Sequence, residues 1–404
     1  MDLFSEKLDD VYFHMKDIDK ILDEFYVLLE KSEDYIKKKK KGQCFKYTIN
    51  KINKISDIPK SSMYDSYFFP NEIQKYIDDN SLYNIHFNCK IVGREIKVHF
   101  IIFHEIKQKD LYIINKQIQM IYMWMYIISN FSVKNCSNYL ILYVYFTPFK
   151  KKLPNNQLII LNTEHVNTGY TTGCKENTEI VLYREEEWFK VFIHETFHNF
   201  GLDFSDMNLS QVNRKLQEYF NVNVEFNLYE SYCETWARII NTMFYSYFSL
   251  TNKLNPKKKY FKSQFYLSIK KEAFHSLYQL LKILNFQDLN YKLITEKKNE
   301  HINICNHLYR EKSSVFSYYI ITGLLLNNFG EFLLWCKKNN NIILMFKKTP
   351  INLEKYIELI GDCKTNKFIN KNIKQMEKAI TSKNVNIDDS LKMTHLDMHE
   401  IFTD

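Results

Sequence analysis

The amino-acid sequence predicts an α+β fold, in which a mixed α/β N-terminal lobe is followed by a mostly helical C-terminal lobe. Runs of β-branched and aromatic residues, typical of strands, lie in the first half of the chain at 84–91, 95–103, 139–147 and 178–183. Runs with apolar residues at helical spacing dominate the second half, at 229–241, 261–286, 311–336 and 353–359. Strands that precede a group of helices in this way are typical of α+β proteins.

The composition indicates a folded chain with few flexible linkers. Hydrophobic residues make up 45% of the 404 residues, whereas there are only 8 glycines and 6 prolines. A chain of this length holds one large domain or a few ordinary ones. We expect an amphipathic helical element at 1–42, an α/β lobe at 43–205, a helical lobe at 206–380 and a loosely ordered tail at 381–404.

The elements of the first half follow from residue spacing. Residues 3–36 have apolar residues at helical spacing, which predicts a long amphipathic helix that ends at the lysines of 37–41. The segment 44–79 is irregular, and Val92-Gly93-Arg94 predicts a hairpin between two strands. The remaining predicted elements are a helix at 110–130, a strand at 158–162 and a turn-rich loop at 167–173.

The predicted strand at 178–183 has two interpretations. It can form the edge of the sheet beside a cleft, where an extended peptide would add as another strand through main-chain hydrogen bonds. It can equally be an internal strand, because alternation of side chains does not reveal which strand lies at an edge.

The segment 191–201, Val-Phe-Ile-His-Glu-Thr-Phe-His-Asn-Phe-Gly, contains the pattern H-E-x-x-H within an apolar predicted helix. Residues four apart share one helix face, so His194 and His198 can bind the same zinc ion. Glu195 would then lie beside the metal, where a carboxylate can act as a general base toward water. The alternative is a core helix whose two histidines are satisfied by neighbouring side chains.

Both ends of this helix carry sequence signals. Glu185, Glu186 and Glu187 are expected in its first turn, where the helix dipole favours negative charge. Gly201 fits the left-handed position that closes a helix.

A catalytic zinc site needs a third protein ligand and one position for water. In the extended pattern H-E-x-x-H-x-x-G-x-x-H, Gly201 matches but the final position is Phe204, which cannot bind a metal. Asp203 lies one residue earlier and is an alternative ligand. The stronger candidates are Glu230 and Glu234, which lie four residues apart among apolar residues of a predicted helix.

His194-Glu195-x-x-His198 followed by Glu230-x-x-x-Glu234 resembles the gluzincin division of the zincin metallopeptidases. The resemblance implies a zincin-like fold, with Glu230 as zinc ligand and Glu234 as the carboxylate that orients a histidine; the two roles can also be exchanged. Segments at 183–194, 234–237 and 314–319 resemble a zincin-like family carried by large nucleocytoplasmic DNA viruses. That resemblance implies activity in the host cytoplasm or in the virion.

The leading hypothesis is a zinc metallopeptidase that hydrolyses peptides or proteins, with Glu195 as the general base. The candidates for stabilising the oxyanion are three tyrosines, Tyr229, Tyr232 and Tyr318, and three histidines of the helical lobe, His275, His301 and His307. The alternative hypothesis is a catalytically inactive zincin fold that serves as a structural or virion-associated interaction protein. The sequence predicts neither the substrate nor the oligomeric state.

Cysteine usage and charge suggest where the chain acts. The 8 cysteines are scattered without a C-x-x-C pair, which favours a reducing, intracellular compartment. Residues 1–10 resemble no signal peptide, and the longest apolar runs fall short of the roughly 18 residues of a membrane span. The net charge of +8 is spread along the chain and does not favour nucleic-acid binding.

Overall fold

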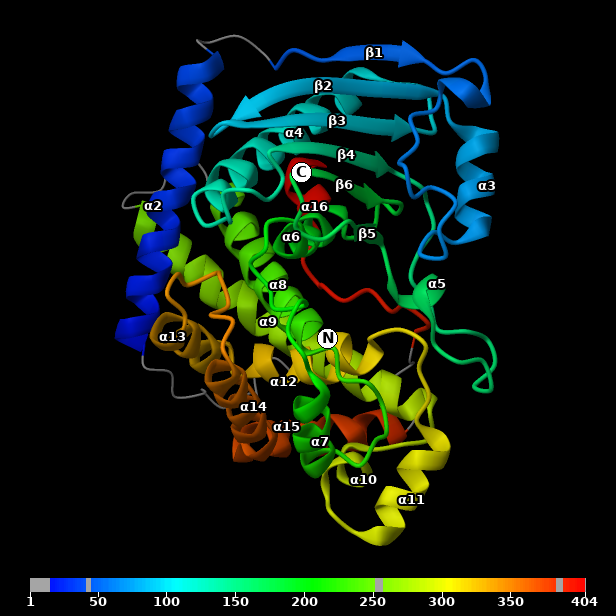
Figure 1. Ribbon diagram of the computed structural model, residues 1–404, viewed down its shortest axis with the longest axis vertical. Coiled ribbons are helices and arrows are strands. Elements are labelled where there is room, and N and C mark those ends of the chain that lie inside the picture. The colour runs from blue at the N-terminus through cyan, green and yellow to red at the C-terminus, as the bar shows by residue number, and fades with distance from the viewer. Residues whose placement is uncertain (1–14, 41–44, 251–256, 383–387, 404) are drawn as a thin grey trace.

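The structure is a computed structural model that describes residues 15–40, 45–250, 257–382 and 388–403. A mixed β-sheet lies at one end of the molecule and a group of helices at the other, as Figure 1 shows. The long helix α2 (Met15–Lys40) packs against helices of both parts. This arrangement confirms the predicted α+β class, because all strands precede residue 183 and helices dominate the chain after it.

The sheet has six strands in the order β1-β2-β3-β4-β6-β5. Strands β1 to β3 pair antiparallel, β3, β4 and β6 pair parallel, and β5 returns antiparallel to β6. The predicted hairpin forms between β2 and β3, because Val92 and Gly93 adopt positive φ angles of 48° and 84° in its two-residue turn. The strands are β1 (Thr48–Lys51), β2 (Tyr83–Ile91), β3 (Arg94–Ile102), β4 (Tyr139–Tyr145), β5 (Gly169–Thr171) and β6 (Asn177–Leu182).

Helices cover both faces of the sheet. On one face lie α4 (Gln108–Ser129) and α6 (Trp188–Asn199), which pack on the buried residues of β4 and β6. The indole Nε1 of Trp124 in α4 donates a hydrogen bond of 2.9 Å to Thr196 Oγ1 in α6. Helix α3 (Asn71–Asn80) covers the opposite face. The helix that carries H-E-x-x-H is therefore held between the sheet and the helical part.

The helical part is built around α8 (Leu228–Phe248), which packs against both α6 and α9 (Lys257–Phe286). The other helical segments are η1 (Ile55–Asp57), α5 (Thr163–Val166), α7 (Ser210–Tyr219), α10 (Tyr291–Thr295), α11 (Asn299–Leu308), the π-helix η2 (Phe316–Ile321), α12 (Thr322–Asn327), α13 (Phe329–Asn339), α14 (Pro350–Thr365), α15 (Lys367–Thr381) and α16 (Met398–Thr403).

A search of the described residues for membrane spans finds no single helix that is long and apolar enough. One pair of consecutive helices, Phe316–Asn327 and Phe329–Asn339, meets the length and composition criteria together but is bent by 91°.

Two predictions for the first half of the chain need correction, and one open question is answered. The segment 44–79 is not irregular throughout, since it contains β1 and α3. Residues 158–162 form no strand, because Leu158 is 77% exposed and Leu161, which is buried, makes only an isolated parallel bridge to Glu311. Of the two interpretations of the strand at 178–183, the structure shows the internal one, because β6 lies between β4 and β5. The edge strand is β5, which is short and lies within the predicted turn-rich loop at 167–173.

The prediction of a loosely ordered tail at 381–404 is wrong for residues 388–403. Residues 388–398, which we name the C-terminal strap, cross between the sheet and the helical part. The amide of Leu391 donates to Lys151 O at 2.9 Å, and the carbonyl of Leu391 accepts from the Tyr319 hydroxyl at 2.7 Å. The polar composition of the strap suggested disorder, but its main chain pairs with residues that are distant in sequence. The part of the N-terminal helix predicted at 3–14 lies outside the described residues.

We expect Leu391→Asp to lower the free energy of unfolding by about 3 kcal/mol or more, because it places an unpaired charge at a site with 0% exposure. Urea denaturation followed by circular dichroism measures this change. The matched variant Leu158→Asp, at a position that is 77% exposed, should change stability by no more than about 0.5 kcal/mol. Equal stability of the two variants would contradict the buried position of the strap.

Candidate metal centre

The two motif histidines and one glutamate converge between α6 and α8. The Nε2 atoms of His194 and His198 are 3.2 Å apart. The Oε2 atom of Glu230, in the first turn of α8, lies 3.1 Å from His194 Nε2 and 3.4 Å from His198 Nε2. The structure therefore brings together the three residues that were predicted as metal ligands.

The triangle formed by these three atoms has the dimensions of a metal site. In a tetrahedral site with ligand bonds of about 2.0–2.1 Å, neighbouring ligand atoms are about 3.3–3.4 Å apart. The observed separations of 3.1, 3.2 and 3.4 Å are close to this value. His194, His198 and Glu230 can therefore hold one metal ion with small adjustments.

The other ring nitrogen of each histidine faces a different carboxylate. His194 Nδ1 lies 3.0 Å from Glu234 Oε2, and His198 Nδ1 lies 2.6 Å from Asp203 Oδ2. When each Nδ1 carries the proton and donates a hydrogen bond to its carboxylate, the lone pairs of both Nε2 atoms face Glu230. The geometry thus separates three acidic residues that the sequence left interchangeable: Glu230 faces the two Nε2 atoms, whereas Glu234 and Asp203 each face one Nδ1 atom.

Asp203 also belongs to a second group of potential ligands, with His198 and Cys233. The Cys233 Sγ atom is 3.9 Å from His198 Nδ1, on the side of the ring that faces away from His194. Burial raises the pKa of the Cys233 thiol to about 12, which disfavours the thiolate that a metal would need. The first group is therefore the better site.

The site gathers buried negative charge. The carboxylates of Glu195, Glu230, Glu234 and Asp203 surround the two imidazoles, and among the described residues Lys190 is the only lysine or arginine that forms a hydrogen bond to any of them. Burial alone would lower the pKa of both histidines. The carboxylates of Glu230 and Glu234 raise the pKa of His194 above its ordinary value, and Cys233 together with Glu230 and Asp203 raises that of His198. The surroundings thus favour positive charge between the imidazoles, and a divalent cation would compensate the carboxylates.

Glu195 lies in a cavity next to the triangle. The cavity has a volume of about 30 Å³, which is enough for at least one water molecule. Burial and the charge of Glu230 raise the pKa of Glu195, while the nearby imidazoles oppose this. Among the described residues its carboxylate has no hydrogen-bond partner. The cavity is lined by Lys151, Val166, Asn167, Thr168, Gly169, Lys190, Val191, His194, Glu195, Glu234, Tyr318 and Met393.

The structure also separates the three predicted tyrosines. Tyr318, in the π-helix η2, lines the cavity, and its ring centroid is 5.9 Å from that of His194. The ring of Tyr229 lies 6.0 Å from that of His198. Tyr232 is fully buried, and its hydroxyl donates to Leu344 O at 3.0 Å in the helical core. Tyr318 and Tyr229 therefore border the site, and Tyr232 does not.

The start of the motif helix differs from the prediction. Helix α6 begins at Trp188, so the glutamates at 185–187 precede it instead of forming its first turn. Glu187 has a φ angle of 60° and forms a buried ion pair with Lys151, which residue spacing does not reveal. At the other end, Gly201 has the expected positive φ of 71°. A Cβ atom at Gly201 would lie only 3.1 Å from Cys136 Sγ.

Cys136 and Cys174 form a disulfide bond beside Gly201, at the end of α6. This pairing could not be predicted from the sequence, because the two cysteines are 38 residues apart and only the fold brings the loop after α4 next to the loop before β6. The other described cysteines, at positions 89, 233, 305, 336 and 363, are free. A disulfide is unusual in the reducing compartment that the scattered cysteines predicted.

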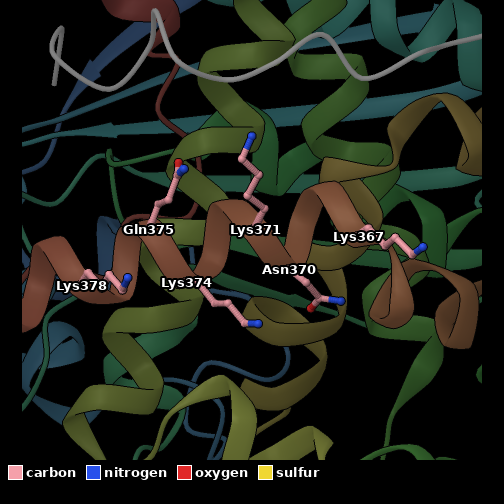
Figure 2. A pocket seen from close by; sticks show the side chains of 6 residues that line it. All are labelled: Lys367, Asn370, Lys371, Lys374, Gln375 and Lys378. Carbon is pink, nitrogen blue, oxygen red and sulfur yellow. The ribbon is translucent and has the colours of Figure 1, made fainter.

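A larger hollow of about 460 Å³ lies on the outer face of α15 (Figure 2). Its side chains are lysines and amides, which extend from one face of the helix: Lys367, Asn370, Lys371, Lys374, Gln375 and Lys378. It contains no histidine, cysteine or carboxylate and therefore resembles a solvated basic face instead of a metal site.

Similarity to known proteins gives no further information about the site. Comparison of the chain with protein-family models, with curated proteins and with solved structures yields no match. The function is therefore inferred from the residues and their geometry.

Glu230→Gln should weaken binding of a divalent metal by more than about 100-fold, because it removes a direct ligand and its charge. Competition with a chromogenic chelator, together with the metal content after dialysis, measures the effect. The matched variant Glu225→Gln changes an exposed carboxylate five residues earlier and should bind metal as the wild type does. Unchanged affinity in Glu230→Gln would exclude the triangle as the site.

Proposed function

We propose that the protein is a zinc-dependent metallopeptidase with a zincin-like fold. The observation that carries this proposal is the convergence of His194, His198 and Glu230 beside a cavity that contains Glu195. Two imidazoles and one carboxylate, with a corner left for water, are the ligand set of a catalytic zinc site; a structural site would have four protein ligands. Zinc, when bound, polarises a carbonyl oxygen and lowers the pKa of water to about 7.

The residues of the chain then have distinct tasks. Glu195 accepts a proton from the attacking water and transfers it to the nitrogen of the departing amine. Burial supports this task, because it raises the pKa of Glu195 and makes its carboxylate a stronger base than an exposed one. Glu234 and Asp203 hold the imidazoles of His194 and His198 in the orientation that the site requires.

Tyr318 is the best placed residue to stabilise the oxyanion. It lines the same cavity as Glu195 and reaches it from a π-helix, a rare element that is frequent at functional sites. Its hydroxyl would donate a hydrogen bond to the oxygen that becomes negative when water attacks the carbonyl. Tyr229, on the other side of the histidines, is the second choice.

The position of β5 supports a peptide as the substrate. This strand is the sheet edge nearest to α6, and its first residue, Gly169, lines the cavity with Glu195. An extended peptide could add to β5 through main-chain hydrogen bonds. The viral resemblance, and with it action in a host cytoplasm or virion, stays a prediction from short segments of sequence.

A second function is favoured by the size of the cavity. A volume of about 30 Å³ is too small for a peptide, so binding of a substrate requires this cavity to widen. A zincin fold that stays closed would use the metal only for stability and act as a structural or interaction protein.

Glu195→Gln should retain zinc and lower peptide hydrolysis by about 100-fold or more, because it removes the general base but no ligand. Digestion of a mixed-peptide pool, followed by mass spectrometry with and without a chelator, measures the activity. Glu164→Gln, an exposed carboxylate near the cavity, is the matched control. Wild-type hydrolysis in Glu195→Gln would refute the mechanism, and a zinc-loaded wild type without hydrolysis would favour the structural role.

Tyr318→Phe should lower kcat by about 100-fold with little change in KM, because the lost hydrogen bond forms mainly in the transition state. Tyr229→Phe removes a hydroxyl from the other side of the histidines and should have the smaller effect. Steady-state kinetics on a peptide cleaved by the wild type compares the two. A loss confined to Tyr229→Phe would transfer the role to that residue.

A further inference from the structure

We propose that Lys190 is a positioning residue of the metal centre: its ammonium holds the carboxylate of Glu234, which in turn holds the imidazole of His194. This inference rests on the metal centre of the proposed function, but it does not depend on peptide hydrolysis.

Lys190 lies on α6 one turn before His194. Its Nζ atom is 2.8 Å and 3.1 Å from the two carboxylate oxygens of Glu234. Glu234 Oε2 is 3.0 Å from His194 Nδ1, so a continuous chain of contacts runs from the ammonium to the imidazole. The side chains of Lys190 and Glu234 are each only 2% exposed, so water competes little for these contacts.

A charged partner is needed because Glu234 is a buried carboxylate among other carboxylates. A buried anion without a compensating cation is strongly destabilising. Lys190 supplies this charge, and its contact with both oxygens fixes the plane of the carboxylate toward His194. Glu234 can then accept the Nδ1 proton, which leaves the Nε2 lone pair of His194 free for the metal.

The two histidines differ in how their orienting carboxylates are held. Asp203 follows His198 by five residues, so the local turn after α6 places it. Glu234 comes from another helix, 40 residues from His194, so its position depends on a contact between the two helices. Lys190 makes this contact between α6 and α8. The C-terminal strap packs against the ammonium from another side, where Met393 Sδ lies 3.7 Å from Nζ.

A second buried ion pair that involves a lysine offers a matched control. Lys151 forms an ion pair with Glu187, and both side chains are at most 1% exposed. This pair has the same charge and burial as Lys190 and Glu234, but no contact of it with a motif histidine is found among the described residues. Its loss should affect stability without affecting the metal.

The test measures affinity for Zn²⁺ by chelator competition in Lys190→Met, Glu234→Gln, the double variant and Lys151→Met. Thermal unfolding of each metal-free protein reports on the fold. We expect Lys190→Met and Glu234→Gln each to weaken binding by about 10- to 100-fold. The double variant should bind about as weakly as Glu234→Gln alone, because Lys190 acts through Glu234. Lys151→Met should lose thermal stability but keep wild-type affinity.

Three results would overturn the inference: a folded Lys190→Met protein with wild-type affinity, losses that multiply in the double variant, or an equal loss of affinity in Lys151→Met. Should Lys190→Met fail to fold, the double variant, which leaves no unpaired charge, still tests the claim against Glu234→Gln. A wild type that binds no zinc would end the proposed function as well, whereas wild-type affinity in Lys190→Met would end this inference alone.

Discussion

The burial of negative charge between α6 and α8 is the constraint on which the rest of the structure depends. Every residue of α6 except His198 is buried, so its polar side chains cannot rely on water. Three of them find partners across the fold, namely Lys190 on α8, Thr196 on α4 and Asn199 on Thr171 of β5, whereas the carboxylate of Glu195 faces the cavity. The remaining carboxylates lie around the two imidazoles, where a bound cation would compensate their negative charge.

The same packing holds the imidazoles in place before any metal arrives. Thr196, which lies between the two histidines in the sequence, accepts a hydrogen bond from the indole of Trp124. The disulfide between Cys136 and Cys174 lies against Gly201 at the end of the helix. Ligands that are held by packing need little rearrangement to bind an ion. A short helix can therefore present two Nε2 atoms 3.2 Å apart despite their mutual repulsion.

Local patterns in the sequence were sufficient to predict the elements with strong periodicity and the two candidate ligands that lie on one helix. The hairpin at 83–102, the helix that carries the histidines and the helix that carries Glu230 were predicted because each depends on neighbouring residues. The order of strands, the disulfide and the C-terminal strap were not predicted, since each depends on segments that meet only in the fold. The roles of Glu230 and Glu234 could not be assigned from the sequence for the same reason. The two residues are one helical turn apart, and only the direction in which α8 crosses α6 decides which of them faces His194 Nε2.

The contrast between the two histidines links metal binding to the assembly of the molecule. His198 and its partner Asp203 belong to one local segment, so half of the site can form as soon as α6 and its turn are in place. The other half needs Glu230 and Glu234 from α8, and Glu234 is held by Lys190 beneath the strap. A metal ion that binds only the complete triangle would stabilise the packing of α6 on α8. Any opening of the cavity that admits a peptide must therefore leave these two helices together.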